Sequence, residues 1–346
     1  MKKTVFVNLV FIVVLITIIE MIFGYWFKAN NFGIYARSER NVRVLVSTEH
    51  SGKKTEHLYK RNFYAFRGDE FNPKDVEIIF MGGSTGNQRY TPENLSIVGK
   101  LNSFLEKDNI NKKIYNASTD GQSTRGYVNN FLYWFTKIPN FKPKVFIFYS
   151  GINDSKCCPK WARHYDFKVA DKTILRVRDY AKNNSILLEL FKKMEDKYFP
   201  KMLFGYIQPY KKSHEDYEFI DFNKAQIKYS KDEINEKQKK MLISFQKNLQ
   251  NLKIQINKYN AKPIFITQVQ YDGNGDNNVF LINKELKKFS KKNNYALIAL
   301  DEIITDLNKA DFYDWVHTTV DGSNKIAKAI YPQLLSNLKI ILMEGN

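Results

Sequence analysis

The chain has 346 residues, and 54 Lys and Arg against 36 Asp and Glu give it a formal net charge of +18. Hydrophobic residues make up 43% and charged residues 26%, which is typical of globular proteins and excludes a globally disordered chain. Two Cys and 16 Gly exclude a disulfide-rich mini-protein and a collagen-like chain. The length allows one large α/β domain or two smaller domains.

The first predicted element is an apolar segment over residues 4–23, close to the ~20 residues that cross a bilayer. Glu20 lies near its far end, and two aromatic residues follow, as they do at membrane interfaces. A cleaved signal peptide would need a shorter apolar region and a small-residue cleavage site, and none follows at Gly24. We expect residues 1–27 to be an uncleaved anchor; a signal peptide and a buried core helix are the alternatives.

Basic residues stand on both sides of this segment, so charge alone does not fix its orientation. Because large domains translocate largely regardless of charge, we expect a single-pass protein of the cell membrane whose main domain is periplasmic or extracellular. The remaining basic excess is mostly Lys scattered through predicted helices, without Arg-rich clusters among aromatics. This pattern does not favour a nucleic-acid partner, and it leaves open an attraction to anionic lipid or an acidic glycan.

Residues 28–75 are predicted to form a polar connector and lead-in segment with some strand-like pieces. From residue 76 onward, short apolar runs alternate with amphipathic stretches, which predicts βαβ units and a mainly parallel sheet between two helical layers in a domain over 76–340. In such sheets, ligands bind beyond the carboxyl ends of the strands. The predicted strands are 76–81, 114–117, 145–149, 263–269 and 296–300, and the predicted helices include 95–107, 124–138, 231–258 and 324–338.

Residues 155–231 interrupt this alternation with many aromatic and charged residues. We interpret them as an insertion beside the active face, either a packing extension or a lid or substrate platform. The adjacent Cys157 and Cys158 have no metal-ligand spacing, and neighbouring Cys residues rarely bridge.

Polar residues and glycines follow the first three predicted strands. Ser84 stands among glycines after the first strand, where a tight turn can expose its hydroxyl. Gly121 follows the second strand and can bring its backbone N–H close to a ligand, because it has no Cβ. Asn153 follows the third strand and offers a neutral amide donor suited to an oxyanion. Each of these motifs alone is an ordinary turn.

Asp314 stands three residues before His317, in a predicted loop before the last helix. This spacing allows the carboxylate to bond Nδ1 of the imidazole and leaves Nε2 as a base. The other four His residues lack this arrangement. Three strand ends and this loop should meet at one edge of the sheet, where they would assemble a nucleophile, a base with its orienting carboxylate, and oxyanion donors.

The order Ser, Gly, Asn and Asp-x-x-His resembles the SGNH/GDSL hydrolase family, including its membrane-anchored, outward-facing members. Ser84 corresponds to the first-block Ser, Gly121 to the second-block Gly, and Asn153 to the Asn of Gly-x-Asn-Asp. Asp314 and His317 correspond to the Asp-x-x-His pair.

The resemblance extends from about residue 60 to 340 and includes a lead-in segment at 62–68. One position departs from the family pattern, since Gly83 stands where the Gly-Asp-Ser signature has Asp.

The resemblance implies a flavodoxin-like three-layer α/β/α fold, preceded here by one N-terminal transmembrane helix. It also implies cleavage of acyl esters, often O-acetyl groups of glycans, through an acyl-enzyme on Ser84. In this reading His317 and Asp314 complete the triad, and the amides of Ser84 and Gly121 with the Asn153 side chain form the oxyanion hole.

Two other functions stay open at this point. An O-acyltransferase would pass the same acyl group to a sugar hydroxyl, and a non-catalytic envelope module would only bind a glycan. We expect no metal or nucleotide cofactor, because the chain has no His-Glu-x-x-His motif, no Cys/His cluster, and no phosphate-loop Lys after Gly82-Gly83-Ser84.

Overall fold

The computed structural model describes residues 2–27, 40–50, 53–156, 181, 184–198, 201–203, 234–269 and 278–343. Most of the insertion predicted over residues 155–231 lies outside these ranges, as do Cys157 and Cys158. The prediction that this insertion is a packing extension, or else a lid or substrate platform, therefore concerns residues that lie mostly outside the described ranges. Two of its elements are described, α7 (Ile186–Tyr198) and β6 (Lys201–Leu203).

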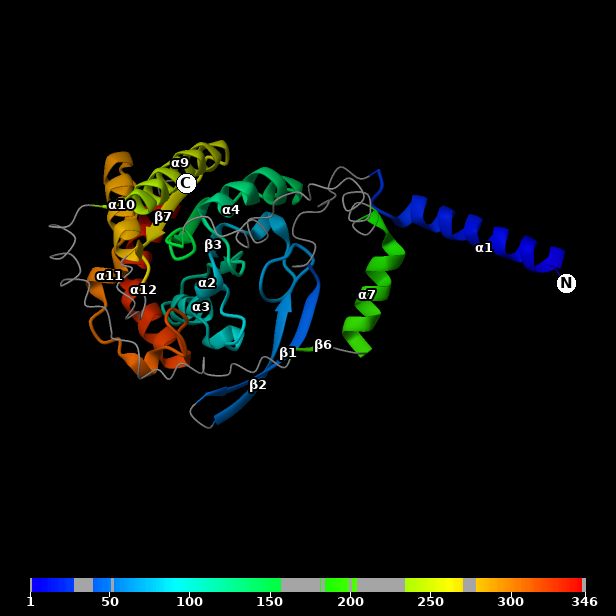
Figure 1. Cartoon of the computed structure of the whole chain (residues 1–346), viewed down its shortest axis with the longest axis horizontal. Helices are drawn as coiled ribbons and strands as arrows, with labels where there is room; N and C mark the ends of the chain where they lie inside the picture. The colour runs from blue at the N-terminus through cyan, green and yellow to red at the C-terminus, as the bar shows by residue number, and fades with distance from the viewer. Residues whose placement is uncertain are drawn as a thin grey trace.

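A five-stranded parallel sheet forms the centre of the main domain (Figure 1). Each predicted strand is present, with boundaries that agree within a few residues. The strand order is β4-β3-β5-β7-β8, the flavodoxin-like arrangement, so the order reverses between β3 and β5. The strands are β3 (Ile78–Gly82), β4 (Ile114–Asn116), β5 (Val145–Tyr149), β7 (Lys262–Ile266) and β8 (Ala296–Ile298).

Helices cover both faces of this sheet, which explains why β3 and β5 are apolar and buried along their whole length. Ile78 and Phe80 of β3 pack against α3 and α12, whereas Ile79 and Met81 lie in the cluster with α4, α9 and α10. The predicted three-layer α/β/α fold is therefore confirmed. The helices are α3 (Ile97–Lys107), α4 (Thr124–Asn129), α9 (Glu236–Lys258), α10 (Asn278–Asn293) and α12 (Val320–Met343).

Local signals explain where several helices begin. The side chain of Ser96 accepts a hydrogen bond from the backbone N–H of Gly99, so α3 starts later than the sequence predicted. Asn235 and Gln238 form a reciprocal capping box at the start of α9. The helix predicted over 124–138 is divided, because α4 continues as a π-helical turn and then a 3₁₀ turn.

The predicted connector forms an antiparallel hairpin of β1 (Val42–His50) and β2 (Lys53–Arg61), and β6 pairs in parallel with β1. Its end is packed into the main domain. The buried guanidinium of Arg61 donates to the carbonyls of Ala65 and Ser118. Arg61 and most of the lead-in segment predicted at 62–68 are therefore packed into the main domain. The division into an anchor, a connector and a hydrolase domain stays a prediction.

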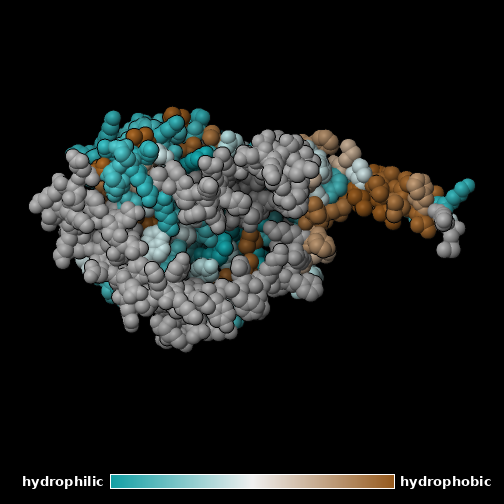
Figure 2. Space-filling model, viewed as in Figure 1, coloured by the Kyte–Doolittle hydropathy of each residue, from teal (hydrophilic) through white to brown (hydrophobic). Residues whose placement is uncertain are grey.

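Helix α1 (Lys2–Phe23) projects away from the main domain (Figure 1). Its surface is apolar along most of its length (Figure 2), and its side chains are largely exposed. By length and composition, Lys3–Phe23 can cross a membrane. A helix of this kind near an N-terminus is either an anchor or a signal peptide.

Candidate active site

Ser84 lies at the turn from β3 into the short helix α2 (Ser84–Asn87). Gly83 is the N-cap of this helix, and Ser84 is its first residue. The strand therefore delivers the hydroxyl to the sheet edge beyond its carboxyl end, next to the point where the strand order reverses. The Ser84 side chain is half-buried, so it is supported by its surroundings while staying reachable.

Ser84, His317 and Asp314 are joined by two short hydrogen bonds. Nε2 of His317 lies 2.6 Å from the Ser84 hydroxyl oxygen, and Nδ1 lies 2.6 Å from Oδ2 of Asp314. The other carboxylate oxygen, Oδ1, accepts from the backbone N–H groups of Val316 and His317 at 2.9 and 2.7 Å. Both oxygens of Asp314 are thus occupied in holding the loop and the imidazole.

These contacts determine the charge of Asp314. Burial acts to raise its pKa, but the hydrogen bonds from His317 and from two backbone N–H groups outweigh burial and hold the pKa below its ordinary value. Asp314 is therefore ionised at neutral pH. Its carboxylate accepts the Nδ1 proton of His317, which leaves Nε2 able to take a proton from the hydroxyl.

The imidazole is also held by its own loop. The ring of Tyr313 stacks on His317, with centroids 5.5 Å apart and planes at 7°. The backbone N–H of Tyr313 donates to the carbonyl of His317 at 3.0 Å, and Phe312 forms an antiparallel bridge with Thr318. Burial raises the pKa of Tyr313 well above its ordinary range, so the stacked ring stays neutral.

Asn153 lies against the turn that carries Ser84. Its side-chain Nδ2 donates to the carbonyl of Gln122 at 3.0 Å. A Cβ placed on Gly83 would be only 2.4 Å from this nitrogen, so a side chain at position 83 and the observed position of Asn153 are incompatible. The glycine at position 83, where the Gly-Asp-Ser signature has Asp, thus leaves room for the close approach of the Asn153 amide.

Gly121 joins this group from the loop after β4. Its φ of +70° lies in the left-handed region, which favours glycine. Ser84, Gly121, Asn153 and His317 all line one pocket of about 330 Å³, while Asp314 lies behind His317. The structure thus brings together the residues that the sequence singled out.

Other residues of this pocket were missed by the sequence reasoning. Arg89 pairs with Asp120 at 2.9 Å, and Asp120 also accepts from the Asn87 side chain at 2.7 Å. Lys156 lies with its ammonium 4.1 Å from the centre of the Trp315 ring. The remaining pocket residues not predicted are Tyr90 and Tyr313. Asp120 directly precedes Gly121, and Lys156 lies two residues after the Gly-x-Asn-Asp motif, so their closeness to these motifs along the chain was the available signal.

Within the part of the chain that the structure describes, no group of three or more His, Cys, Asp and Glu side chains is arranged to hold a metal ion.

Residues 66–330 match the family described as GDSL-like Lipase/Acylhydrolase. The chain belongs to this family of ester hydrolases. Similar solved structures include an acetyl xylan esterase, Axe2, from Geobacillus stearothermophilus, at 14% identity and a TM-score of 0.43, covering 75% of this chain and 96% of that chain. A psychrotrophic esterase, EstA, from Pseudoalteromonas sp. is similar at 13% identity and a TM-score of 0.44, covering 77% and 100%.

A third similar structure, TesA, has 13% identity and a TM-score of 0.43, and the match covers 77% of this chain and 99% of that chain. The comparison with curated protein sequences found no significant match.

Proposed function

We propose that this ester hydrolase is a serine esterase of the SGNH type, with Ser84 as nucleophile, His317 as general base and Asp314 as the orienting carboxylate. One observation carries the proposal. A continuous line of hydrogen bonds runs from Oδ2 of Asp314 through both ring nitrogens of His317 to the hydroxyl of Ser84, with 2.6 Å at each step. This is the geometry that proton transfer from a serine hydroxyl requires.

The reaction proceeds in two halves. As the Ser84 oxygen attacks the ester carbonyl carbon, its proton passes to Nε2 of His317, and the carbonyl oxygen becomes an oxyanion. When the intermediate collapses, the bond to the alcohol oxygen breaks, and His317 returns the proton to the departing alcohol. Water then attacks the acyl-enzyme with His317 again as base, which releases the carboxylic acid and restores Ser84.

The oxyanion is assigned to the backbone N–H groups of Ser84 and Gly121 and to the side-chain amide of Asn153. An amide NH₂ carries two protons. The hydrogen bond to the Gln122 carbonyl uses one of them and orients the group, so the other is the donor assigned to the substrate. Donors fixed in this way need no reorganisation when the charge develops.

The pocket favours a small acyl group on a polar alcohol. Its volume of about 330 Å³ is at the lower end for ligand sites, and polar side chains including Arg89, Asp120 and Lys156 line it. These features support O-acetyl esters of a cell-envelope glycan as the substrate class. We further propose that residues 1–27 are a retained anchor and that the hydrolase domain over 76–340 faces the periplasm or the cell exterior.

The test uses the full chain in lipid nanodiscs. We expect a fluorophosphonate probe to label Ser84 and the protein to release acetate from acetylated oligosaccharides. The Ser84→Ala variant should lose both properties, whereas Ser103→Ala, on α3, should keep both. Normal acetyl-ester turnover by folded Ser84→Ala would refute the mechanism. Transfer of the acetyl group to an added oligosaccharide, without acetate release, would refute hydrolysis as the principal reaction.

A further inference from the structure

Helix α7 exposes a continuous apolar face. Leu190, Phe191 and Met194 lie at helical spacing on one side of the helix, and we call them the apolar face of α7. Their exposed fractions are 48%, 64% and 55%. Soluble monomers rarely leave such a group of large apolar side chains in water, and an exposed group of this kind indicates a site of contact with another protein or with a membrane.

The start of α7 is bound to the end of α1. The carboxylate of Glu20 accepts hydrogen bonds from the Ser185 hydroxyl at 2.5 Å and from the backbone N–H groups of Ile186 and Leu187 at 3.1 and 3.2 Å. The first N–H groups of a helix have no partner within the helix, and the helix dipole favours an anion there. Glu20 of α1 therefore caps α7.

A second set of contacts secures this junction. The backbone N–H of Tyr25 donates to the carbonyl of Asn184 at 2.8 Å, and the indole of Trp26 donates to Glu20 at 3.0 Å. After α7, the chain continues into β6, which pairs with Val44–Val46 of β1. Helix α7 is thus attached to α1 at one end and to the main domain at the other.

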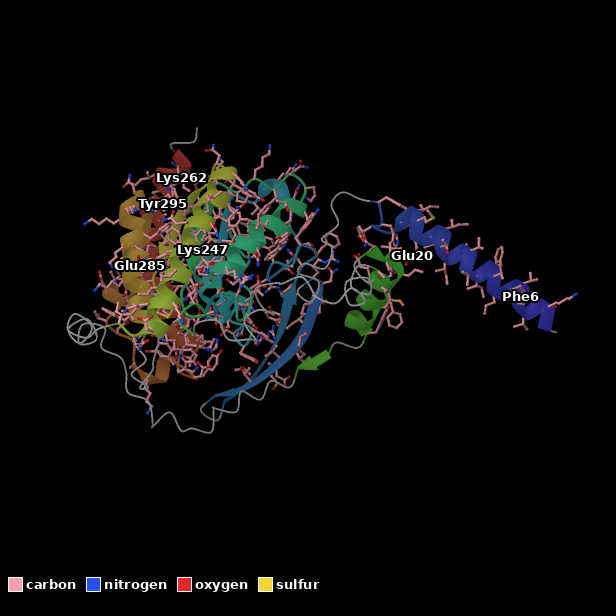
Figure 3. All side chains as sticks on the ribbon, turned by 45° about the horizontal axis from the view of Figure 1, so that its top comes forward. Phe6, Glu20, Lys247, Lys262, Glu285 and Tyr295 are labelled. Carbon is pink, nitrogen blue, oxygen red and sulfur yellow. The ribbon has the colours of Figure 1, made fainter. Side chains whose placement is uncertain are left out.

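The two helices cross at a steep angle. Figures 1 and 3 both show α7 running across the end of α1, and Figure 3 labels Glu20 at this junction. Figure 2 shows the apolar surface of α1 continuing onto the adjacent part of α7. If α1 crosses a bilayer, a helix set across its end lies along the membrane surface, where amphipathic helices bury an apolar face at the boundary of headgroups and acyl chains.

We propose that the apolar face of α7 is seated in the surface of the same bilayer that α1 crosses. The occupant is lipid, because this face continues the apolar surface of α1 and is joined to it through Glu20. The inference rests on the proposed anchoring of α1 and is independent of the esterase activity. It gives the anchor a second function, since α1 and α7 together fix the tilt of the hydrolase domain over the membrane.

Lipid contact can be measured at single labelled positions. In a Cys157→Ser, Cys158→Ser background, Met194→Cys in α7, Ile12→Cys in α1 and Ile243→Cys in α9 would each carry an environment-sensitive fluorophore. These positions are matched, since their native side chains are 55%, 53% and 64% exposed. The full chain is placed in phosphatidylcholine nanodiscs with or without nitroxide-labelled acyl chains.

We expect the nitroxide lipid to quench the label at Met194→Cys and Ile12→Cys and to leave the label at Ile243→Cys unchanged, because α9 lies far from α1 (Figure 1). Adding Glu20→Ala should reduce quenching at position 194 and keep it at position 12. Quenching at position 12 alone would overturn the docking of α7 while retaining the anchor. Quenching at neither position would overturn both, whatever the esterase activity.

A second copy of the chain is the competing occupant. It would shield the label at position 194 from a water-soluble quencher without any effect of the nitroxide lipid, and this result would also overturn the proposal.

Discussion

The side-chain amide of Gln88 donates a 3.1 Å hydrogen bond to the hydroxyl of Thr318, the residue that follows His317. The same nitrogen lies 2.6 Å from the hydroxyl of Ser323, and the amide oxygen accepts from the backbone N–H of Ile97 at 2.7 Å. Gln88 is also the C-cap of α2, in the left-handed conformation. One buried side chain thus joins the helix that carries Ser84 to the loop that carries His317.

We predict that Gln88→Ala lowers kcat by as much as ~10²-fold with little change in KM, because a displacement of about 1 Å between nucleophile and base has a cost of that order. The rate of fluorophosphonate labelling at Ser84 should fall in parallel. Gln238→Ala is the matched control, since Gln238 is also buried and bonds Asn278 at 3.1 Å at the start of α9. If both variants lose stability alike and neither loses kcat, Gln88 has no positioning role.

We predict that Asn153→Ala lowers kcat by ~10²–10³-fold, which is typical for the loss of one oxyanion donor. The reason is that Asn153 lines the pocket beside Ser84 and that its Nδ2 is oriented by the Gln122 carbonyl. Hydrolysis of an aryl acetate gives kcat and KM separately, and the deficit should be in kcat. Asn102→Ala removes an amide that bonds the backbone of Ile114 away from the pocket, so it should affect stability alone. An equal kcat for the two variants would argue against the oxyanion assignment.

Gly83→Ala tests the same donor without changing it. The new Cβ would meet Nδ2 of Asn153 at 2.4 Å, so the amide must shift. We predict a loss of kcat close to that of Asn153→Ala. The effects of two substitutions that disturb one contact are not additive, so the kcat of the double variant should be little lower than that of either single variant. If the loss of kcat in the double variant equals the product of the two single losses, Gly83 acts by another route. If Gly83→Ala keeps the kcat of the unmodified chain, the amide tolerates the displacement.

The sheet was predictable because each strand is an apolar run bounded by polar or turn residues. Val145–Tyr149 matches its predicted span, and it lies in the middle of the sheet with both faces buried. Boundaries shifted elsewhere because apolar runs continue into loops that are themselves buried. The stretch after β7 is an example, since Thr267 and Gln268 are fully buried although neither belongs to the strand.

The site was predictable where its chemistry is encoded locally. The spacing of Asp314 and His317 fixes their contact within one turn, and a serine after a buried strand has a defined place at the sheet edge. Gln88 was not predictable, because its partners Thr318 and Ser323 are more than 200 positions away along the chain. Arg61 was missed for a related reason, since charged residues are almost never fully buried and its buried bonds to carbonyls exist only in the folded chain.

The ionisation of Asp314 leads to a prediction about both activity and pH. Asn in place of Asp314 can present its NH₂ to Nδ1 of His317 and so favour the wrong imidazole tautomer, and we expect Asp314→Asn to lower kcat at neutral pH by up to ~10⁴-fold. The hydrogen bonds that hold the pKa of Asp314 below its ordinary value of 3.8 also stabilise the folded state.

Because this pKa is lower in the folded than in the unfolded chain, the stabilisation is complete above the unfolded value and is lost as the pH falls through 3.8 toward the folded value. The free energy of unfolding of the unmodified chain should therefore exceed that of Asp314→Asn by a constant amount near neutral pH, and the difference should shrink below about pH 4. Denaturant titrations at a series of pH values measure this difference. If this difference in the free energy of unfolding stays constant through the acidic range, the carboxylate is not held ionised by His317 and the loop. The assigned role of Asp314 would then have to be abandoned.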